Sequence, residues 1–418
     1  MAHRVIDVNE RPPLAESIPL SFQHLFAMFG ASVLVPILFK INPATVLMMN
    51  GVGTLIYIFI CKGKIPAFLG SSFAFLSPVF LVIANYGYNA ALGGFIASGL
   101  IFITVALLFK FFGIEWIHVV FPPAAMGAIV AIIGLELAPT AADMAGLIAK
   151  NNQPLDPKTV FVSMSTLAII VLGSVLFRGF FKIIPILIGV ISGYIIALFM
   201  GIVNFDAISN APWFAAPTIY TPQFNLSAIL IIVPASLVVI AEHIGHLIVT
   251  GNIVEKDLVK DPGLHRSLMG DGISTTLSGF FGSVPTTTYG ENIGVLAITK
   301  VYSVWVIGGA AVISILISFF GKLSAAIQTI PLPVMGGVSL MLFGVIAASG
   351  IRMLVEEKID YSKPKNLILT AFVLTIGISG AQVVFGSVTL KGMALATVLS
   401  IVISLGFKLF EKLGWMNE

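Results

Sequence analysis

Long apolar stretches recur from one end of the chain to the other, and they constrain its fold more than any other feature. Crossing about 30 Å of hydrocarbon takes ~20 helical residues at ~1.5 Å each. Fourteen stretches of the 418 residues reach or approach that length: 18–39, 43–60, 66–84, 90–109, 119–138, 160–177, 183–202, 226–250, 267–283, 284–299, 302–320, 330–349, 365–382 and 390–410. We therefore expect an all-α polytopic membrane protein with fourteen transmembrane segments.

The composition favours a lipid bilayer as the solvent of most of the chain. Hydrophobic residues make up 58% of it and charged residues only 10%, which leaves too little charged surface for a soluble protein of this length. Cys61 is the single cysteine, so internal disulfides and multi-cysteine metal sites are excluded. No small-residue cleavage site follows the first apolar stretch, and we expect that stretch to be retained.

Lysine and arginine are distributed unevenly between the two ends of these stretches. The N-terminal tail, every second loop and the C-terminal tail together hold 17 of the 22 basic residues, and the opposite side holds 5. By the positive-inside rule, both termini face the cytoplasm. The basic residues follow the topology and form no patch suited to nucleic acid, so no nucleic-acid partner is predicted.

Three similarities, in the same order, relate the first half of the chain to the second. They are the spacing P-x3-G-x6-G (Pro123, Gly127, Gly134 and Pro333, Gly337, Gly344), a polar residue before histidine (Gln23-His24 and Glu242-His243), and an initial proline (Pro66 and Pro285). Each pairs stretch n with stretch n+7. Because seven is odd, the second copy would cross the membrane in the opposite direction, which predicts a 7+7 inverted repeat.

The third and tenth stretches, IPAFLGSSFAFLSPV and VPTTTYGENIGVLAIT, differ from ordinary membrane helices. Both open with proline, continue through small or extended-favouring residues, and then resume a helical pattern. We expect each to be broken into a short extended piece and a half helix, with the two extended pieces pairing as antiparallel β-strands because lipid cannot satisfy their backbone groups. The half helices would direct unpaired N–H groups toward the protein centre. Transporters built from inverted repeats hold their substrate at such helix ends.

Acidic residues within the stretches are rare, which makes each one a candidate functional group. Glu291 follows Gly290 at the expected start of a half helix. It either stabilises the helix dipole or faces a cavity, and the cost of a mid-membrane acid favours the cavity. Glu136 and Asp271 lie nearer the ends of their stretches, and we interpret both as edge or gating residues.

The sequence E-H-x-x-H in the eighth stretch places Glu242 and His246 four residues apart on one helical face, whereas His243 points elsewhere. Such a pair either shares a proton or only fixes helix packing. The order of acid and histidine differs from the zinc motif H-E-x-x-H, and no cysteine cluster accompanies it. The sequence therefore predicts neither a metal nor another cofactor.

Phe73 follows Ser72 at the break of the third stretch. In the predicted repeat, this position of the first copy is equivalent to the Glu291 region of the second. We expect the Phe73 ring to stack on a ligand. Gln23 and His24 fit packing or hydrogen bonding at least as well as ligand contact.

Two acids, helix N–H donors and an aromatic ring suit a neutral planar solute that carries N–H and C=O groups. Two carboxylates would repel an inorganic anion, and a metal ion would need no ring. A pyrimidine base fits: its ring stacks on Phe73, its N–H groups donate to Glu242 and Glu291, and a carbonyl accepts from the Gly290 or Glu291 backbone. Protonation of Glu242, Glu291 or His246 would then accompany substrate loading.

The run ENIGVLAITK, from Glu291 to Lys300, matches the (Q/E/P)-N-x-G-x4-T-(R/K/G) motif of the nucleobase–ascorbate transporter family, also called nucleobase:cation symporter-2. Gln23-His24 matches the Q-H pair of that family's first span. The segments LFAMFGAS, CKGKIPAFLGSSFAF, FPPAAMGAIVA, AEHIGH and KDPGLHRS resemble its bacterial uracil-carrying members over nearly the whole chain. The acid at the first motif position is similar to those members, whereas xanthine and urate carriers usually have glutamine there.

The resemblance implies uracil–proton symport in the bacterial cytoplasmic (inner) membrane by a homodimer joined through its gate domains. It implies a core domain from residues 18–109 and 226–320 and a gate domain from 119–202 and 330–410. The residues carried over are Phe73, Glu242, Gly290 and Glu291 for uracil, His246 with the two acids for the proton, and Ser72, Tyr289, Asn292, Gln23 and His24 in support.

Three alternatives remain open. A carrier of a purine, xanthine or ascorbate in the same family is the nearest, and an anion exchanger sharing the fold is more distant. A membrane-embedded enzyme is disfavoured because no nucleophile, base and orienting residue come together on an accessible loop.

Overall fold

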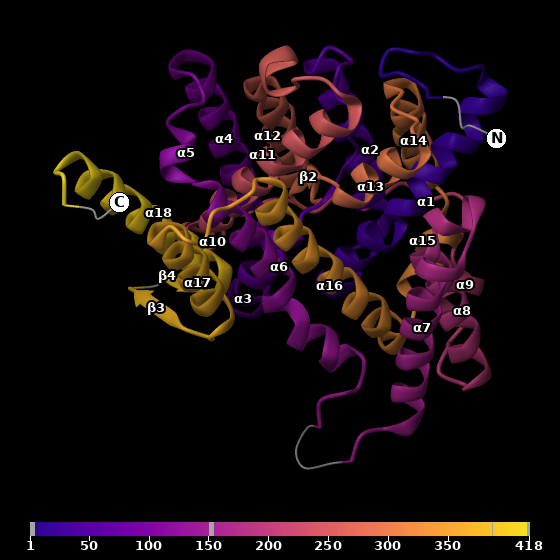
Figure 1. Ribbon diagram of the computed structural model, residues 1–418. Helices are drawn as coiled ribbons and strands as arrows, with labels where there is room; N and C mark the ends of the chain where they lie inside the picture. The colour runs from indigo at the N-terminus through magenta and orange to yellow at the C-terminus, as the bar shows by residue number, and fades with distance from the viewer. Residues whose placement is uncertain (1–4, 150–153, 387, 416–418) are drawn as a thin grey trace.

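The structure, a computed structural model, describes residues 5–149, 154–386 and 388–415, and it consists mainly of helices (Figure 1). In this part of the chain, eight helical segments are long and apolar enough to cross a membrane: Leu14–Phe39, Pro43–Ile60, Tyr88–Phe112, Pro123–Met144, Pro157–Leu176, Leu226–Val254, Leu332–Glu356 and Gly392–Lys412. Four shorter apolar segments are Phe73–Tyr86, Pro185–Phe199, Val304–Ser318 and Pro364–Ile378. This number of apolar helices is that of a multi-pass membrane protein.

Each of the fourteen predicted stretches contains a helix. In chain order these are α1 (Leu14–Phe39), α2 (Pro43–Ile60), α3 (Leu76–Tyr86), α4 (Tyr88–Phe112), α6 (Pro123–Met144), α7 (Pro157–Leu176), α8 (Pro185–Phe199), α10 (Leu226–Ile232) with α11 (Pro234–Val254), α12 (Leu264–Phe281), α13 (Gly290–Thr299), α14 (Val304–Ser318), α16 (Leu332–Glu356), α17 (Pro364–Ile378) and α18 (Gly392–Lys412). A 3-10 turn at Phe73–Phe75 precedes α3.

Some elements differ from the sequence prediction. The stretch 226–250 is not one helix, because Pro234 has no N–H to donate and the helical run restarts there as α11. A hairpin of β3 (Gln382–Phe385) and β4 (Val388–Lys391) occupies the predicted boundary between the last two stretches. Among the described residues, three short α-helices lie outside the predicted stretches or at their edges: α5 (Ile117–Val120), α9 (Asp206–Asn210) and α15 (Gly321–Gln328). A 3-10 helix at Gly179–Ile183 and a π-helix at Val259–Gly263 lie between stretches or at an edge as well.

The two broken stretches meet as predicted. β1 (Leu69–Ser71) pairs antiparallel with β2 (Thr286–Thr288), with Gly70 opposite Thr287, and all six residues are buried. Two further bonds extend the ladder, from Ser72 N to the Pro285 oxygen at 2.9 Å and from Tyr289 N to the Phe68 oxygen at 3.1 Å. Each strand thus satisfies backbone groups of the other in a place without water.

Hydroxyl groups of neighbouring helices satisfy backbone N–H groups on the outer edges of this two-stranded sheet. The Leu69 N–H donates to Thr54 Oγ1 of α2 at 2.9 Å, and the Thr286 N–H donates to Thr275 Oγ1 of α12 at 3.1 Å. A strand edge normally invites another strand. Here side chains take that place, which fixes both strands between α2 and α12.

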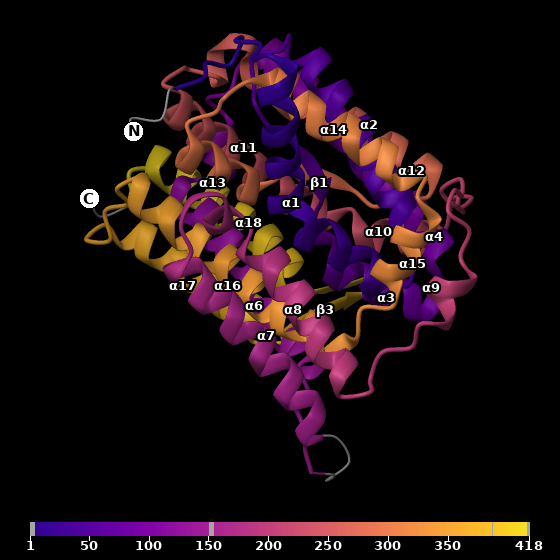
Figure 2. The same cartoon turned by 90° about the vertical axis from the view of Figure 1, so that its right-hand side faces the viewer.

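The helices pack in two groups on either side of α1, α11 and the strands (Figure 2). One group contains α2, α4, α12 and α14, and the other contains α6, α7, α16 and α17. Gly127 lets α6 approach α16 closely, since a Cβ there would lie 3.0 Å from the Gly350 carbonyl oxygen. The matching glycines of the spacing pattern do not repeat this contact: Gly337 faces α7, and no described atom lies within 4 Å of a Cβ on Gly344.

Candidate substrate site

A cavity of about 270 Å³ lies where α11, α13 and α16 meet the break between β1 and α3. The predicted binding and coupling residues all line it, together with Tyr289: Phe73, Glu242, His246, Gly290 and Glu291. At its other end the cavity reaches Arg352 and Glu356 near the end of α16. Residues more than 200 positions apart in the sequence therefore form one site.

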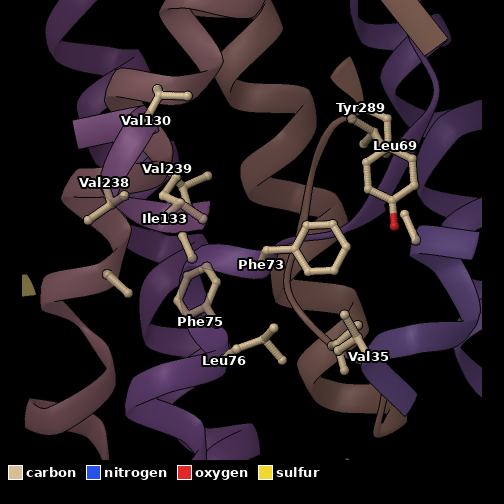
Figure 3. Close-up of a cluster of buried hydrophobic side chains, with 14 of the residues drawn as sticks. Val35, Leu69, Phe73, Phe75, Leu76, Val130, Ile133, Val238, Val239 and Tyr289 are labelled. Atoms are coloured by element: carbon tan, nitrogen blue, oxygen red, sulfur yellow. The ribbon is translucent and has the colours of Figure 1, made fainter. Parts of the chain in front are cut away.

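Phe73 contributes the aromatic surface at the closed end of the cavity. The residue is 7% exposed, and its ring contacts Phe343 of α16 edge to face, with 5.8 Å between ring centroids. Figure 3 shows the ring directed toward Tyr289 and Leu69, away from Phe75. The break after β1 places Phe73 here because it begins the 3-10 turn that leads into α3.

Glu242 and His246 face the cavity from successive turns of α11. Oε2 of Glu242 is buried, and no described residue donates a hydrogen bond to it. His246 Nδ1 lies 3.2 Å from Thr288 Oγ1, so β2 orients the imidazole. A Cβ on Gly290 would lie 3.4 Å from His246 Nε2, so the start of α13 lies directly beside this ring.

The first turn of α13 supplies donors next to these acceptors. Gly290 and Glu291 begin the helix, and the Tyr289 side chain makes no capping hydrogen bond. The first backbone N–H groups of a helix lack partners within it and carry the positive end of its dipole. The cavity thus places N–H donors beside the carboxyl groups of Glu291 and Glu242.

Four of the predicted supporting residues stand behind the cavity instead of lining it. Asn292 donates through Nδ2 to His24 Nδ1 at 2.8 Å and accepts from the Phe68 N–H at 3.3 Å. These bonds tie the first turn of α13 to α1 and to the start of β1. Gln23 and Ser72 are buried outside the lining as well, at 7% and 2% exposure.

The interpretation of Asp271 as an edge residue is wrong. Its side chain is fully buried, Oδ2 lies 3.2 Å from His243 Nδ1, and Oδ1 accepts a hydrogen bond from Thr286 Oγ1 at 3.0 Å. On the other side of the imidazole, Nε2 lies 2.7 Å from Ser267 Oγ, which lies 2.7 Å from Tyr57 Oη. This buried network links α2, α11 and α12 and reaches β2 at Thr286.

Sequence reasoning missed this network although the chain carries a signal for it. Polar residues recur three or four positions apart along α12, at Ser267, Asp271, Ser274, Thr275 and Ser278. All five are buried. A polar stripe on a membrane helix indicates a partner within the protein, and here the partners are His243 and β2.

Comparisons with known proteins agree with one another. A family model described as "Permease family" matches residues 15–386. The chain is 64% identical to the uracil permease of Paenibacillus larvae, with each chain covered completely, and 65% identical to that of Escherichia coli K12, over 99% of this chain and 96% of the relative. It is 47% identical to the uracil permease of Bacillus subtilis, over 96% of this chain and 94% of the relative.

Solved structures of low sequence identity share the fold. The overall structure of SLC26A9 has a TM-score of 0.71 at 11% identity and covers 95% of this chain and 66% of its own. The transmembrane domain of the cyanobacterial bicarbonate transporter BicA has a TM-score of 0.61 at 13% identity and covers 97% of this chain and 99% of its own. At this identity the likeness shows the fold alone.

Proposed function

Because the chain belongs to the permease family, we propose that it imports uracil across the bacterial cytoplasmic membrane by proton symport. The observation that carries the proposal is the convergence of Glu242, Glu291 and the first turn of α13 on one cavity beside Phe73. The high identity to uracil permeases over the full length supports the choice of solute.

Uracil is complementary to these groups. Its two N–H groups donate to the Glu242 and Glu291 carboxylates, and one of its carbonyl oxygens accepts from the Gly290 or Glu291 N–H. Its ring packs on Phe73. A buried acceptor such as Glu242 Oε2 is costly without a donor, so a ligand N–H that reaches it gains affinity.

The proton in this proposal passes through the Glu242 and His246 side of the cavity. The two groups lie on one face of α11, and His246 is held by Thr288 at the end of β2. Uracil and the proton would then bind at neighbouring groups of the same cavity. The two acids and His246 are the candidate proton carriers.

We extend the proposal to the architecture. The fourteen segments form a 7+7 inverted repeat, with a core domain (18–109 and 226–320), a gate domain (119–202 and 330–410) and both termini in the cytoplasm. The antiparallel pairing of β1 with β2, which stand at equivalent positions of the two copies, supports the repeat. Two protomers would join through their gate domains.

The test is uptake of labelled uracil into proteoliposomes of the purified protein, with and without an inward proton gradient. Accumulation that needs the gradient and is competed by uracil but not by xanthine is the expected result. Competition by xanthine instead would favour the purine carrier of the same family. Saturable uptake that does not depend on the gradient would refute proton coupling, but it would remain consistent with the proposed uracil-binding site.

The fold likeness to a bicarbonate transporter raises the alternative of an anion as the solute. The side chains of the cavity disfavour it. Glu242 and Glu291 face the interior, whereas Arg352 lies at the mouth with 63% of its side chain exposed and pairs with Glu356 at 2.6 Å. Chloride or bicarbonate should therefore fail to compete with uracil.

A further inference from the structure

One carboxylate joins three helices on the side of the molecule away from the mouth of the cavity. Glu136 of α6 accepts a hydrogen bond from Ser77 Oγ of α3 at 2.6 Å through Oε1. Through Oε2 it accepts from the Met393 N–H, in the first turn of α18, at 2.7 Å. A Cβ on Gly392 would overlap the carboxyl group, so the backbone of α18 packs directly against Glu136.

These two bonds differ in what they connect. α6 packs against α16, α17 and α18, and α18 also packs against α17, so the bond to Met393 attaches α18 to the helix group that contains α6 and α17. α3 packs against α4 and α10 and follows β1, so the bond to Ser77 crosses to the part of the molecule that carries the strands. Of these two bonds of Glu136, the Ser77 bond is the one that would have to break if the two parts separated at this end.

The Ser77 bond also lies on the far side of the barrier that closes the substrate cavity. Ser77 follows Phe73 by one helical turn, and Glu136 lies six residues beyond Val130, about 9 Å along α6 at ~1.5 Å per residue. Phe73 and Val130 line the substrate cavity, whereas Ser77 and Glu136 line a second cavity of about 300 Å³.

Buried apolar side chains separate the two cavities. Phe75, Leu76 and Ile133 are at most 1% exposed and belong to one apolar cluster (Figure 3), and Phe343 meets the ring of Phe73 from α16. In this conformation the path from the substrate cavity ends at Phe73. On the other side it runs toward Arg352 and Glu356.

We propose that Glu136 is a gating residue that holds the outer end of the transport path closed through its hydrogen bond to Ser77. The inference rests on the proposed transport function and assigns one step of its cycle. Opening to the outside requires that α3 leave Glu136, while the bond to Met393 keeps the carboxylate on the α6 and α18 side. Neither Ser77 nor Glu136 touches the substrate cavity, so their loss should change the conformational equilibrium more than the intrinsic affinity.

The test is a thiol reporter placed in the barrier. Ile133→Cys is built in a Cys61→Ala background, because Cys61 is the chain's single cysteine. Cells that produce the protein are treated with a membrane-impermeant maleimide, and the rate of labelling reports opening to the outer side. Ser77→Ala should raise this rate about tenfold or more, the effect of losing a typical hydrogen bond to a charged group. Glu136→Gln, which keeps one acceptor of the two, should raise it as well.

Ser339→Ala is the matched control, because the Ser339 hydroxyl, like that of Ser77, donates a hydrogen bond, but its acceptor is the Met335 oxygen within the same helix, α16. Its labelling rate should stay within about twofold of the parent's. Folded Ser77→Ala and Glu136→Gln proteins that both label at the parent rate would overturn the proposal. Equal acceleration by Ser339→Ala would overturn it too, since the helices would then have loosened without specificity. Labelling needs no uracil. A parent protein that binds no uracil would therefore refute the transport proposal, and the labelling rates of the variants could still be compared with that of the parent.

Discussion

Replacing Glu291 by glutamine should weaken uracil binding about 5- to 12-fold. The substitution keeps the shape and one acceptor but removes the charge. A hydrogen bond to a charged group contributes about 1.5–3 kcal/mol, and a neutral one about 0.5–1.5 kcal/mol. The difference of about 1–1.5 kcal/mol corresponds to that loss of affinity, at tenfold per ~1.4 kcal/mol.

Isothermal titration calorimetry of the purified protein with uracil measures this difference. Glu356→Gln is the matched control, because Glu356 lines the same cavity at its mouth and is paired with Arg352 at 2.6 Å. We expect its Kd to stay within about twofold of wild type. A Glu291→Gln protein with wild-type Kd, or equal losses in both variants, would refute the assignment of Glu291 to the ligand.

Three further predictions test the surroundings of the site. His246→Ala should damage proton-driven accumulation in proteoliposomes more than the Kd for uracil; unchanged proton dependence would remove it from the coupling path. Asp271→Asn should lower the melting temperature measured by intrinsic fluorescence, because the buried bond from Thr286 and the His243 contact lose a charged partner; an unchanged melting temperature would mean that the network does not support β2. The Lys256 ammonium, which donates to Asp7 at 2.8 Å, lowers the pKa of that carboxyl. Its stabilisation is present above about pH 4, the unfolded pKa of aspartate, and disappears as the pH falls through the lower folded value. Since 61% of the Asp7 side chain is exposed, Lys256→Ala should cost less than ~1 kcal/mol at pH 7 and nothing near pH 2; a loss independent of pH would contradict this.

The broken stretches could be predicted because their sequence conflicts with the solvent implied by the rest of the chain. Polar and small residues between Pro285 and Glu291 cannot continue a lipid-facing helix, and an extended backbone in that place needs a partner. The only comparable stretch was the one around Gly70, which sets the pairing of β1 with β2. The gathering of Phe73, Glu242 and Glu291 follows from that pairing together with the helical spacing in α11.

The partners of buried polar groups could not be predicted in the same way. Helical periodicity shows that His243 points away from Glu242, but it does not show which helix it meets. That requires the crossing of α11 with α12, which places Asp271 3.2 Å from the imidazole. Glu136 illustrates the same limit: the sequence indicates an edge or gating acid, and only the packing of α3 and α18 reveals Ser77 and Met393 as its donors.

In the proposed site, a few side chains placed on a shared backbone would determine the choice of solute. A helix N-terminus carries roughly +0.5 of a charge, and by itself it attracts anions. Glu291 in the first turn of α13 more than cancels this charge when ionised, and Glu242 adds a second acid to the same cavity. The backbone N–H groups remain as donors, but the surroundings now repel an anion and favour a neutral solute that offers N–H groups of its own. A fold shared with a bicarbonate transporter can in this way serve a nucleobase without any change of architecture.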